Sequence, residues 1–155
     1  GIRQDPEWKA GEYSTQPRAA LQIAADFLII AGSAPARMQE DSATRDSADK
    51  YLEDTIKRVS TGLDANDLLY AVSASRNYEP SAKLGDIKAP VMFINSADDF
   101  INPPELGIAE REIKNVKKGR FVLLPISEKT RGHGTHTRAA LWQEYLKELL
   151  NESER

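Results

Sequence analysis

The sequence has 155 residues, 40% of them hydrophobic, and a mean hydropathy of -0.53, which predicts one soluble domain-sized core with extensive solvated surface. Its 24 acidic and 21 basic side chains give a formal net charge of -3 without a basic cluster, so we expect no nucleic-acid partner. Cysteine is absent, which excludes disulfides and a Cys nucleophile, and the longest apolar run, residues 27–32, is too short to span a membrane.

The first half of the chain predicts three helices. Residues 1–16 are polar without a sustained period, which indicates an extended lead-in. Apolar residues at helical spacing predict helices over residues 17–32 and 47–60, with no helix between them. Asp64 can cap a third helix, whose apolar positions are Leu68, Leu69 and Val72.

The second half predicts a strand, a helix, a strand and a helix. Short apolar runs at residues 90–95 and 120–126 are typical of strands buried on both faces. Helical spacing predicts helices over residues 104–117 and 137–151. This order is that of a parallel α/β sheet.

Two strands cannot form such a sheet by themselves. Buried parallel strands need neighbours along their edges and helices on both faces, and three preceding helices do not supply them. We therefore expect the C-terminal fragment of a larger α/β protein. In this fragment a helical cap, residues 1–85, precedes a β-α-β-α part of the core, residues 86–155.

Titratable side chains follow both predicted strands. Asp99 lies in the loop after the first strand, and His133 lies in the loop after the second. The carboxyl ends of parallel strands meet at one edge of a sheet, where open α/β sheets place their reactive groups. A carboxylate beside an imidazole is the arrangement of an orienting acid and a general base, so a carboxylate of the first loop, Asp98 or Asp99, and a histidine of the second, His133 or His136, form the candidate pair.

The loops carrying these residues resemble those of a known family. Asp99-Phe-Ile-Asn-Pro103 resembles the D-x-x-x-P loop of α/β-hydrolases, and Gly132-His133 resembles their G-H loop. More narrowly, the chain resembles the homoserine O-acetyltransferase-like branch through Asp5-Pro-x-Trp8, Gly11-x-Tyr13, Leu63-Asp-Ala-Asn66 and Asn95-Ser-Ala-Asp-Asp99. In that family the nucleophilic Ser lies upstream on a G-x-S-x-G turn, a motif that does not occur in these 155 residues.

The resemblance implies the C-terminal part of an acyltransferase or hydrolase, related to methionine biosynthesis, in which Asp99 and His133 complete a triad with an upstream Ser. This chain alone should be inactive. The resemblance further implies a small-molecule acyl donor and acceptor, with acetyl-CoA as a co-substrate of the complete enzyme. It also implies a homodimer or swapped oligomer in the cytoplasm, with no bound cofactor or metal and no membrane association.

Each residue assignment has an alternative. Asp99 could be only a turn carboxylate and His133 only an exposed loop histidine. Asp98 competes with Asp99, but Asp99 lies four residues before Pro103, as the family loop requires. His136 lies at a loop-to-helix boundary, which favours a structural role, and a metal site built from both histidines and the Asp pair is the least favoured reading.

The substrate is also open. Gly134 follows the G-H pair where the homoserine acetyltransferases have Asp, and Asp67-Leu68 stands where their cap continues with Ser-Tyr. The fold supports both acyltransferases and esterases, depending on whether water or a second substrate reaches the acyl-enzyme. A non-catalytic helical interaction or assembly module is the other reading, and a G-x-S-x-G encoded upstream would decide against it.

Overall fold

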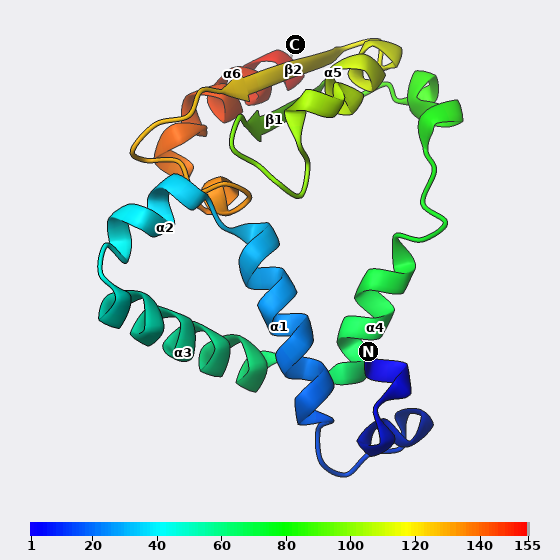
Figure 1. Ribbon diagram of the computed structural model, residues 1–155. Coiled ribbons are helices and arrows are strands. Elements are labelled where there is room, and N and C mark those ends of the chain that lie inside the picture. The colour runs from blue at the N-terminus through cyan, green and yellow to red at the C-terminus, as the bar shows by residue number, and fades with distance from the viewer. Residues whose placement is uncertain (155) are drawn as a thin grey trace. The chain divides into compact units, whose positions relative to one another are not determined.

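Helices precede a two-stranded parallel sheet in the computed structural model, which describes residues 1–154 (Figure 1). The α-helices and strands are α1 (Arg18–Gly32), α2 (Pro35–Asp41), α3 (Arg45–Gly62), α4 (Ala65–Ala74), β1 (Val91–Ser96), α5 (Ile108–Glu112), β2 (Gly119–Leu124) and α6 (Gln143–Ser153). They form two units. One comprises Gly1–Ala31 with Gln39–Tyr78, and the other comprises Gly32–Met38 with the chain from Glu79 onward.

The N-terminal residues are not extended, so this prediction was wrong. They form 3₁₀ turns over Ile2–Gln4 and Pro6–Gly11, the second interrupted by a kink where Lys9 and Ala10 are left-handed. The Asp5 carboxylate caps the second one by accepting a hydrogen bond of 2.9 Å from the Glu7 amide, and Pro6 occupies a first-turn position where no N–H is needed. These local capping signals outweigh the missing hydrophobic period.

The core of the first unit lies where the N-terminal segment meets α1 and α4. Ile2, Ala20, Leu21 and Ala65 are its buried members, and partly buried side chains pack around them. Leu21 is 1% exposed, and burial of such a side chain contributes about 1.5–3 kcal/mol. The N-terminal segment is therefore part of this core.

Polar contacts join the same two regions. Trp8 Nε1 donates to Asn66 Oδ1 at 2.9 Å, and the Tyr13 hydroxyl donates to Asp64 Oδ1 at 2.7 Å. Hydrogen bonds from Gln16 and then from Tyr13 lower the pKa of Asp64 to about 2. One hydrogen-bonded cluster thus contains five of the residues on which the family resemblance rests in this half, namely Trp8, Gly11, Tyr13, Asp64 and Asn66.

The predicted helices of the first half are confirmed, with one addition. Thr44 and Ser47 form a capping box that starts α3 two residues earlier than predicted, and Asp64 caps α4 through the amides of Asn66 and Asp67. The addition is α2, which begins at Pro35, a residue compatible with the first turn of a helix. Its seven residues are too few for helical spacing to reveal it.

Parallel pairing of the two strands, predicted from their order, is also confirmed. β1 and β2 pair from Val91↔Gly119 to Ser96↔Leu124, so both strands end at the same edge. Burial on both faces was wrong, because Phe93 is 38% exposed and Leu123 is 44% exposed. These side chains share one face, and α6 is tied to the other face by an ion pair between Arg120 and Glu148 at 3.0 Å.

The helices beside the strands are shorter than predicted. The expected helix over residues 104–117 is divided, because Gly107 adopts a left-handed φ of 60° between a 3₁₀ turn and α5. The helix expected over residues 137–151 begins only at Gln143, after the 3₁₀ turns Gly134–Thr137 and Ala139–Leu141.

Within residues 1–154, no single helix is long and apolar enough to cross a membrane, and only α1 and α2 taken together across their sharp break reach that length and composition.

Candidate active site

The loop after β1 holds Asp99 in a closed turn. Asp99 Oδ1 accepts hydrogen bonds from the amides of Ile101 at 2.8 Å and Asn102 at 3.1 Å. Asn95, the last but one residue of β1, closes the loop by donating from Nδ2 to the Asn102 carbonyl at 2.7 Å. These bonds hold the Asp99 carboxylate in one orientation, where it is only 6% exposed.

Asp99 is nevertheless stabilised as a carboxylate. Burial by itself raises the pKa of Asp99, but hydrogen bonds from the Asn102 amide, from His133 and from the Ile101 amide outweigh it, and the pKa lies below its usual value. An ionised, nearly buried acid is what an orienting partner of a catalytic histidine requires.

The loop after β2 brings His133 to the same edge. The Arg131 amide donates to Thr135 Oγ1 at 2.9 Å, which closes the loop around the histidine. Gly132 has a φ of 57°, and a Cβ built there would lie 2.7 Å from the Ser33 carbonyl oxygen. Only glycine fits this position without strain, so the G-H pair has a steric basis.

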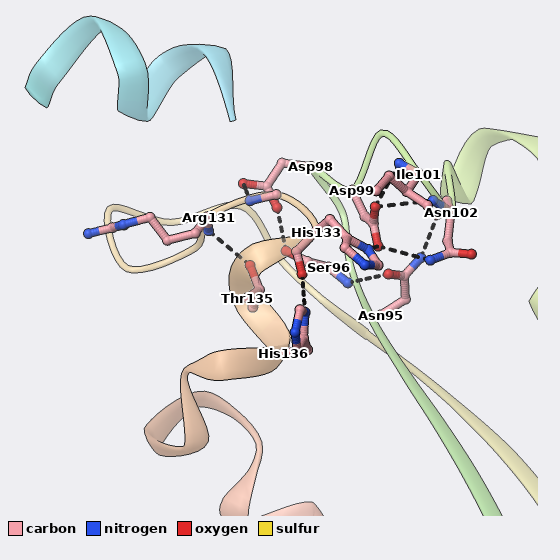
Figure 2. A network of polar contacts seen from close by, with 11 residues as sticks. Asn95, Ser96, Asp98, Asp99, Ile101, Asn102, Arg131, His133, Thr135 and His136 are labelled. Atoms are coloured by element: carbon pink, nitrogen blue, oxygen red, sulfur yellow. Dashed lines mark hydrogen bonds and ion pairs between the residues drawn. The ribbon is translucent and has the colours of Figure 1, made fainter. Parts of the chain in front are cut away.

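His133 and Asp99 are in direct contact. Nδ1 of His133 lies 3.1 Å from Oδ2 of Asp99, and Figure 2 shows the two side chains next to one another. Because a carboxylate can only accept hydrogen bonds, Nδ1 carries the proton and Nε2 is left as the basic nitrogen. The His133 side chain is 36% exposed, so the ring is accessible from solvent. The structure thus brings together the two predicted site residues.

Asp98 contacts other groups. It accepts hydrogen bonds from the Gly132 amide at 3.1 Å and from the Ser96 hydroxyl. Figure 2 shows the carboxylates of Asp98 and Asp99 directed to different parts of the network. In this structure it is therefore Asp99, and not Asp98, that contacts His133.

His136 lies next to His133. Its ring centroid is 5.1 Å from that of His133, and its Nδ1 lies 2.6 Å from the His133 carbonyl oxygen. The His136 carbonyl in turn accepts a hydrogen bond from Trp142 Nε1 at 3.0 Å. Among residues 1–154, no group of three or more His, Cys, Asp or Glu side chains is arranged to hold a metal ion.

A cavity of about 360 Å³ opens beside this pair. Its wall includes the carboxyl end of β1, Asp99, both histidines and Trp142. Such a volume lies in the range of small-molecule sites, and apolar walls with a few convergent polar groups are typical of them. The cavity can therefore hold a small molecule beside the histidine.

Sequence reasoning missed the residues that support the pair. Asn95 and Thr135 are both buried and hold the two loops. The signal for Asn95 was a polar amide at the end of an apolar strand, where a buried side chain needs a hydrogen-bonding partner. Thr135 had no such signal, because its partner is a backbone amide in a loop without periodicity.

Neither a protein-family model nor a curated protein matches the sequence. Solved structures match almost all of it. The crystal structure of esterase E22 superposes with a TM-score of 0.79 at 20% identity, covering 96% of this chain and 47% of that chain. Homoserine O-acetyltransferase from Bacillus anthracis superposes with a TM-score of 0.74 at 20% identity, covering 97% of this chain and 46% of that chain. The acetyl esterase MekB superposes with a TM-score of 0.72 at 22% identity, covering 97% of this chain and 47% of that chain.

The chain therefore has the fold of the C-terminal half of an α/β-hydrolase, as predicted. It spans about half the length of these solved structures. The two exposed apolar side chains on one face of the sheet agree with this, because larger sheets of this kind carry further strands and covering helices.

Proposed function

We propose that this chain is the C-terminal half of an acyl-transfer enzyme that acts on acetyl esters or acetyl thioesters. In this enzyme Asp99 orients His133, and His133 is the general base for a Ser on a strand-to-helix turn of the upstream half. The observation that carries the proposal is the contact of 3.1 Å between Asp99 Oδ2 and His133 Nδ1 at the ends of two neighbouring parallel strands.

The chemistry follows from the roles of the two groups. His133 Nε2 takes the proton of the Ser hydroxyl as that oxygen attacks the acetyl carbonyl, and it later returns the proton to the leaving group. Asp99 holds the Nδ1–H tautomer and stabilises the imidazolium that forms. Water or an acceptor hydroxyl then releases the acetyl group from the Ser, again with His133 as the base.

The acetyl group as the transferred unit is supported by the similar structures. Two of the three named above carry it in their names, an acetyl esterase and a homoserine O-acetyltransferase. For an acetyltransferase, acetyl-CoA is the proposed donor and homoserine is the proposed acceptor. Hydrolysis is favoured, because the site departs from the acetyltransferase pattern at Gly134, where no acidic side chain follows the histidine.

The test is the chain produced together with its upstream sequence. We expect saturable hydrolysis of p-nitrophenyl acetate and stoichiometric labelling of one upstream Ser by a fluorophosphonate. Incubation with acetyl-CoA and homoserine, followed by detection of O-acetylhomoserine, separates the transferase from the esterase. If no upstream G-x-S-x-G exists and neither activity appears, the chain is a non-catalytic interaction module and the proposal is wrong.

A further inference from the structure

Two adjacent carboxylates, Asp98 and Asp99, contact the histidine loop, and the mechanism above uses only Asp99. Asp99 contacts the His133 imidazole, whereas Asp98 bridges the loops after β1 and β2. One Asp98 oxygen accepts from the Ser96 hydroxyl and the other accepts from the Gly132 amide at 3.1 Å. Ser96 is the last residue of β1, so Asp98 ties the histidine loop to the end of that strand.

The Gly132 amide belongs to the residue directly before the histidine. Gly132 is buried in a left-handed conformation against the Ser33 carbonyl, so its N–H can point in few directions. An acceptor that captures this N–H fixes the Arg131–Gly132 peptide plane, and the restricted backbone of Gly132 then sets where His133 starts. Because the imidazole extends from that backbone, its direction toward Asp99 follows from the same orientation.

The charge state of Asp98 suits this contact. Burial by itself raises the pKa of Asp98, but hydrogen bonds from Ser96, Gly132 and Thr130 outweigh it and keep the pKa below its usual value. An ionised carboxylate accepts through both oxygens, which matches one donor on each side. Asp98 therefore forms charge-assisted hydrogen bonds with the end of β1 and with the loop after β2.

We propose that Asp98 is a positioning residue for the acyl-transfer site: its hydrogen bond to the Gly132 amide aims the His133 imidazole at Asp99. The proposal rests on the proposed function in that His133 acts there as a base. It adds a second acid to the pair, one that is absent from the cavity lining, does not contact the imidazole and acts through the backbone.

The decisive measurement uses three variants that separate geometry from charge. Asp98→Asn keeps an oxygen that accepts from Gly132 N–H but removes the charge. Asp98→Ala removes the acceptor. Asp98→Leu also removes the acceptor but fills the space of the side chain. This variant replaces Asp98→Ala if the Ala variant fails to fold. Thermal unfolding of each variant shows that the fold is kept.

The readout is ¹⁵N NMR of the imidazoles in the 155-residue chain, which contains only two histidines. A His136→Gln variant assigns the two signals. We expect wild type and Asp98→Asn to show the downfield Nδ1–H proton of a His133 bonded to Asp99, and Asp98→Ala or Asp98→Leu to lose it. A wild-type His133 signal in a folded Ala or Leu variant would overturn the proposal, and so would loss of the signal in Asp98→Asn.

Kinetics in the chain joined to its upstream half give the second readout. A catalytic group displaced by about 1 Å costs about 100-fold in rate, so kcat should fall by about that factor in Asp98→Ala with KM unchanged, and Asp98→Asn should restore it. The NMR result does not depend on a nucleophile. If Asp98→Ala loses the Nδ1–H signal but even the wild-type protein shows no hydrolysis, the positioning role is retained and the proposed function is rejected.

Discussion

Nδ1 of His133 lies 3.1 Å from Oδ2 of Asp99, although 34 residues separate them in the chain. The contact exists because β1 and β2 are parallel and in register to their last residues, so both loops leave the sheet at one edge. Gly132, the residue before the histidine, has a left-handed backbone with a φ of 57°. The sheet brings the two loops together, and the loops determine the contact.

Removal of either member of the pair should abolish turnover in the chain joined to its upstream half. Asp99→Asn and His133→Ala should each lower kcat by about 10⁴-fold or more, because a histidine in the wrong tautomer alone costs about that factor in a serine protease. The measurement is the steady-state hydrolysis of p-nitrophenyl acetate.

Two variants serve as controls for this prediction. His136→Ala removes the neighbouring imidazole and should have a much smaller effect, since His136 contacts a carbonyl and not Asp99. Asp86→Asn removes an exposed carboxylate outside the site. Near-normal turnover by His133→Ala would count decisively against the assignment.

Gly132→Ala should disturb the site more than it destabilises the protein. A left-handed backbone at a residue with a Cβ costs roughly 1–2 kcal/mol, and the added atom would lie 2.7 Å from the Ser33 carbonyl oxygen. Urea unfolding measures the first effect, and the His133 Nδ1–H signal measures the second. Gly134→Ala is the matched control, because its nearest neighbour is the Arg131 Cβ at 3.5 Å. If both variants had the same urea midpoint and the same His133 Nδ1–H signal, the loop would have room to move and the prediction would be wrong.

The sequence predicts the sheet and the pair because both depend on short-range signals. Two apolar runs identify β1 and β2, and the rule that parallel strands place reactive groups at their carboxyl ends identifies the two loops. The choice of Asp99 and His133 within these loops came from the family resemblance. The division of the helix after β1 was missed because Gly107 lies in an otherwise helical pattern. Its left-handed backbone depends on the turn around it and not on the hydrophobic period.

The N-terminal segment could not be predicted for a different reason. Trp8 and Tyr13 find their partners 58 and 51 residues later, on the N-terminal end of α4. No period within residues 1–16 records such contacts, and a polar segment without a period reads as a loop. The family resemblance grouped these residues without giving a physical reason, which the hydrogen-bonded cluster now supplies.

Asp64 should make the stability of the chain depend on pH in the acid range. Its pKa is lowered from 3.8 to about 2 in the folded protein. A depressed pKa adds stability that is present above pH 3.8 and is lost as the pH falls through 2. The urea midpoint of wild type should therefore fall more steeply between pH 4 and pH 2 than that of Asp64→Asn. Asp67→Asn, a neutralised exposed acid on the same helix, should retain the wild-type slope. If the urea midpoints of Asp64→Asn and wild type changed in parallel between pH 4 and pH 2, the prediction would be refuted.

Self-association of the isolated chain is predicted through α1. Ile23 and Phe27 lie one turn apart on this helix and are 52% and 71% exposed, which is unusual for large apolar side chains on a monomer. Burial of Phe27 against a second copy is worth about 1.5–3 kcal/mol, so Phe27→Lys should weaken the dimer by about 10- to 100-fold. Sedimentation velocity measures the change, with Leu150→Lys on α6 as the control. A compact wild-type monomer at high concentration would reject the prediction.

The 155-residue chain by itself should be catalytically silent, although it holds the Asp99–His133 pair. Acyl transfer requires a nucleophile within about 3 Å of the base and donors for the oxyanion. The local hydroxyls do not meet this requirement. Ser96 is buried and donates to Asp98, Ser127 accepts from the Lys129 amide at 3.3 Å, and Ser33 lies between two helices instead of on a strand-to-helix turn.

We therefore expect the purified chain to hydrolyse p-nitrophenyl acetate only at the background rate and to remain unlabelled by a fluorophosphonate. The His133→Ala variant should be indistinguishable from it in both assays, since a base without a nucleophile has no proton to take. Under the proposed function, addition of the upstream half should produce both signals together, because the proposed Ser would supply the hydroxyl and the turn around it would supply the oxyanion donors. Stoichiometric labelling of a serine in the chain alone, lost in His133→Ala, would place the nucleophile within these residues.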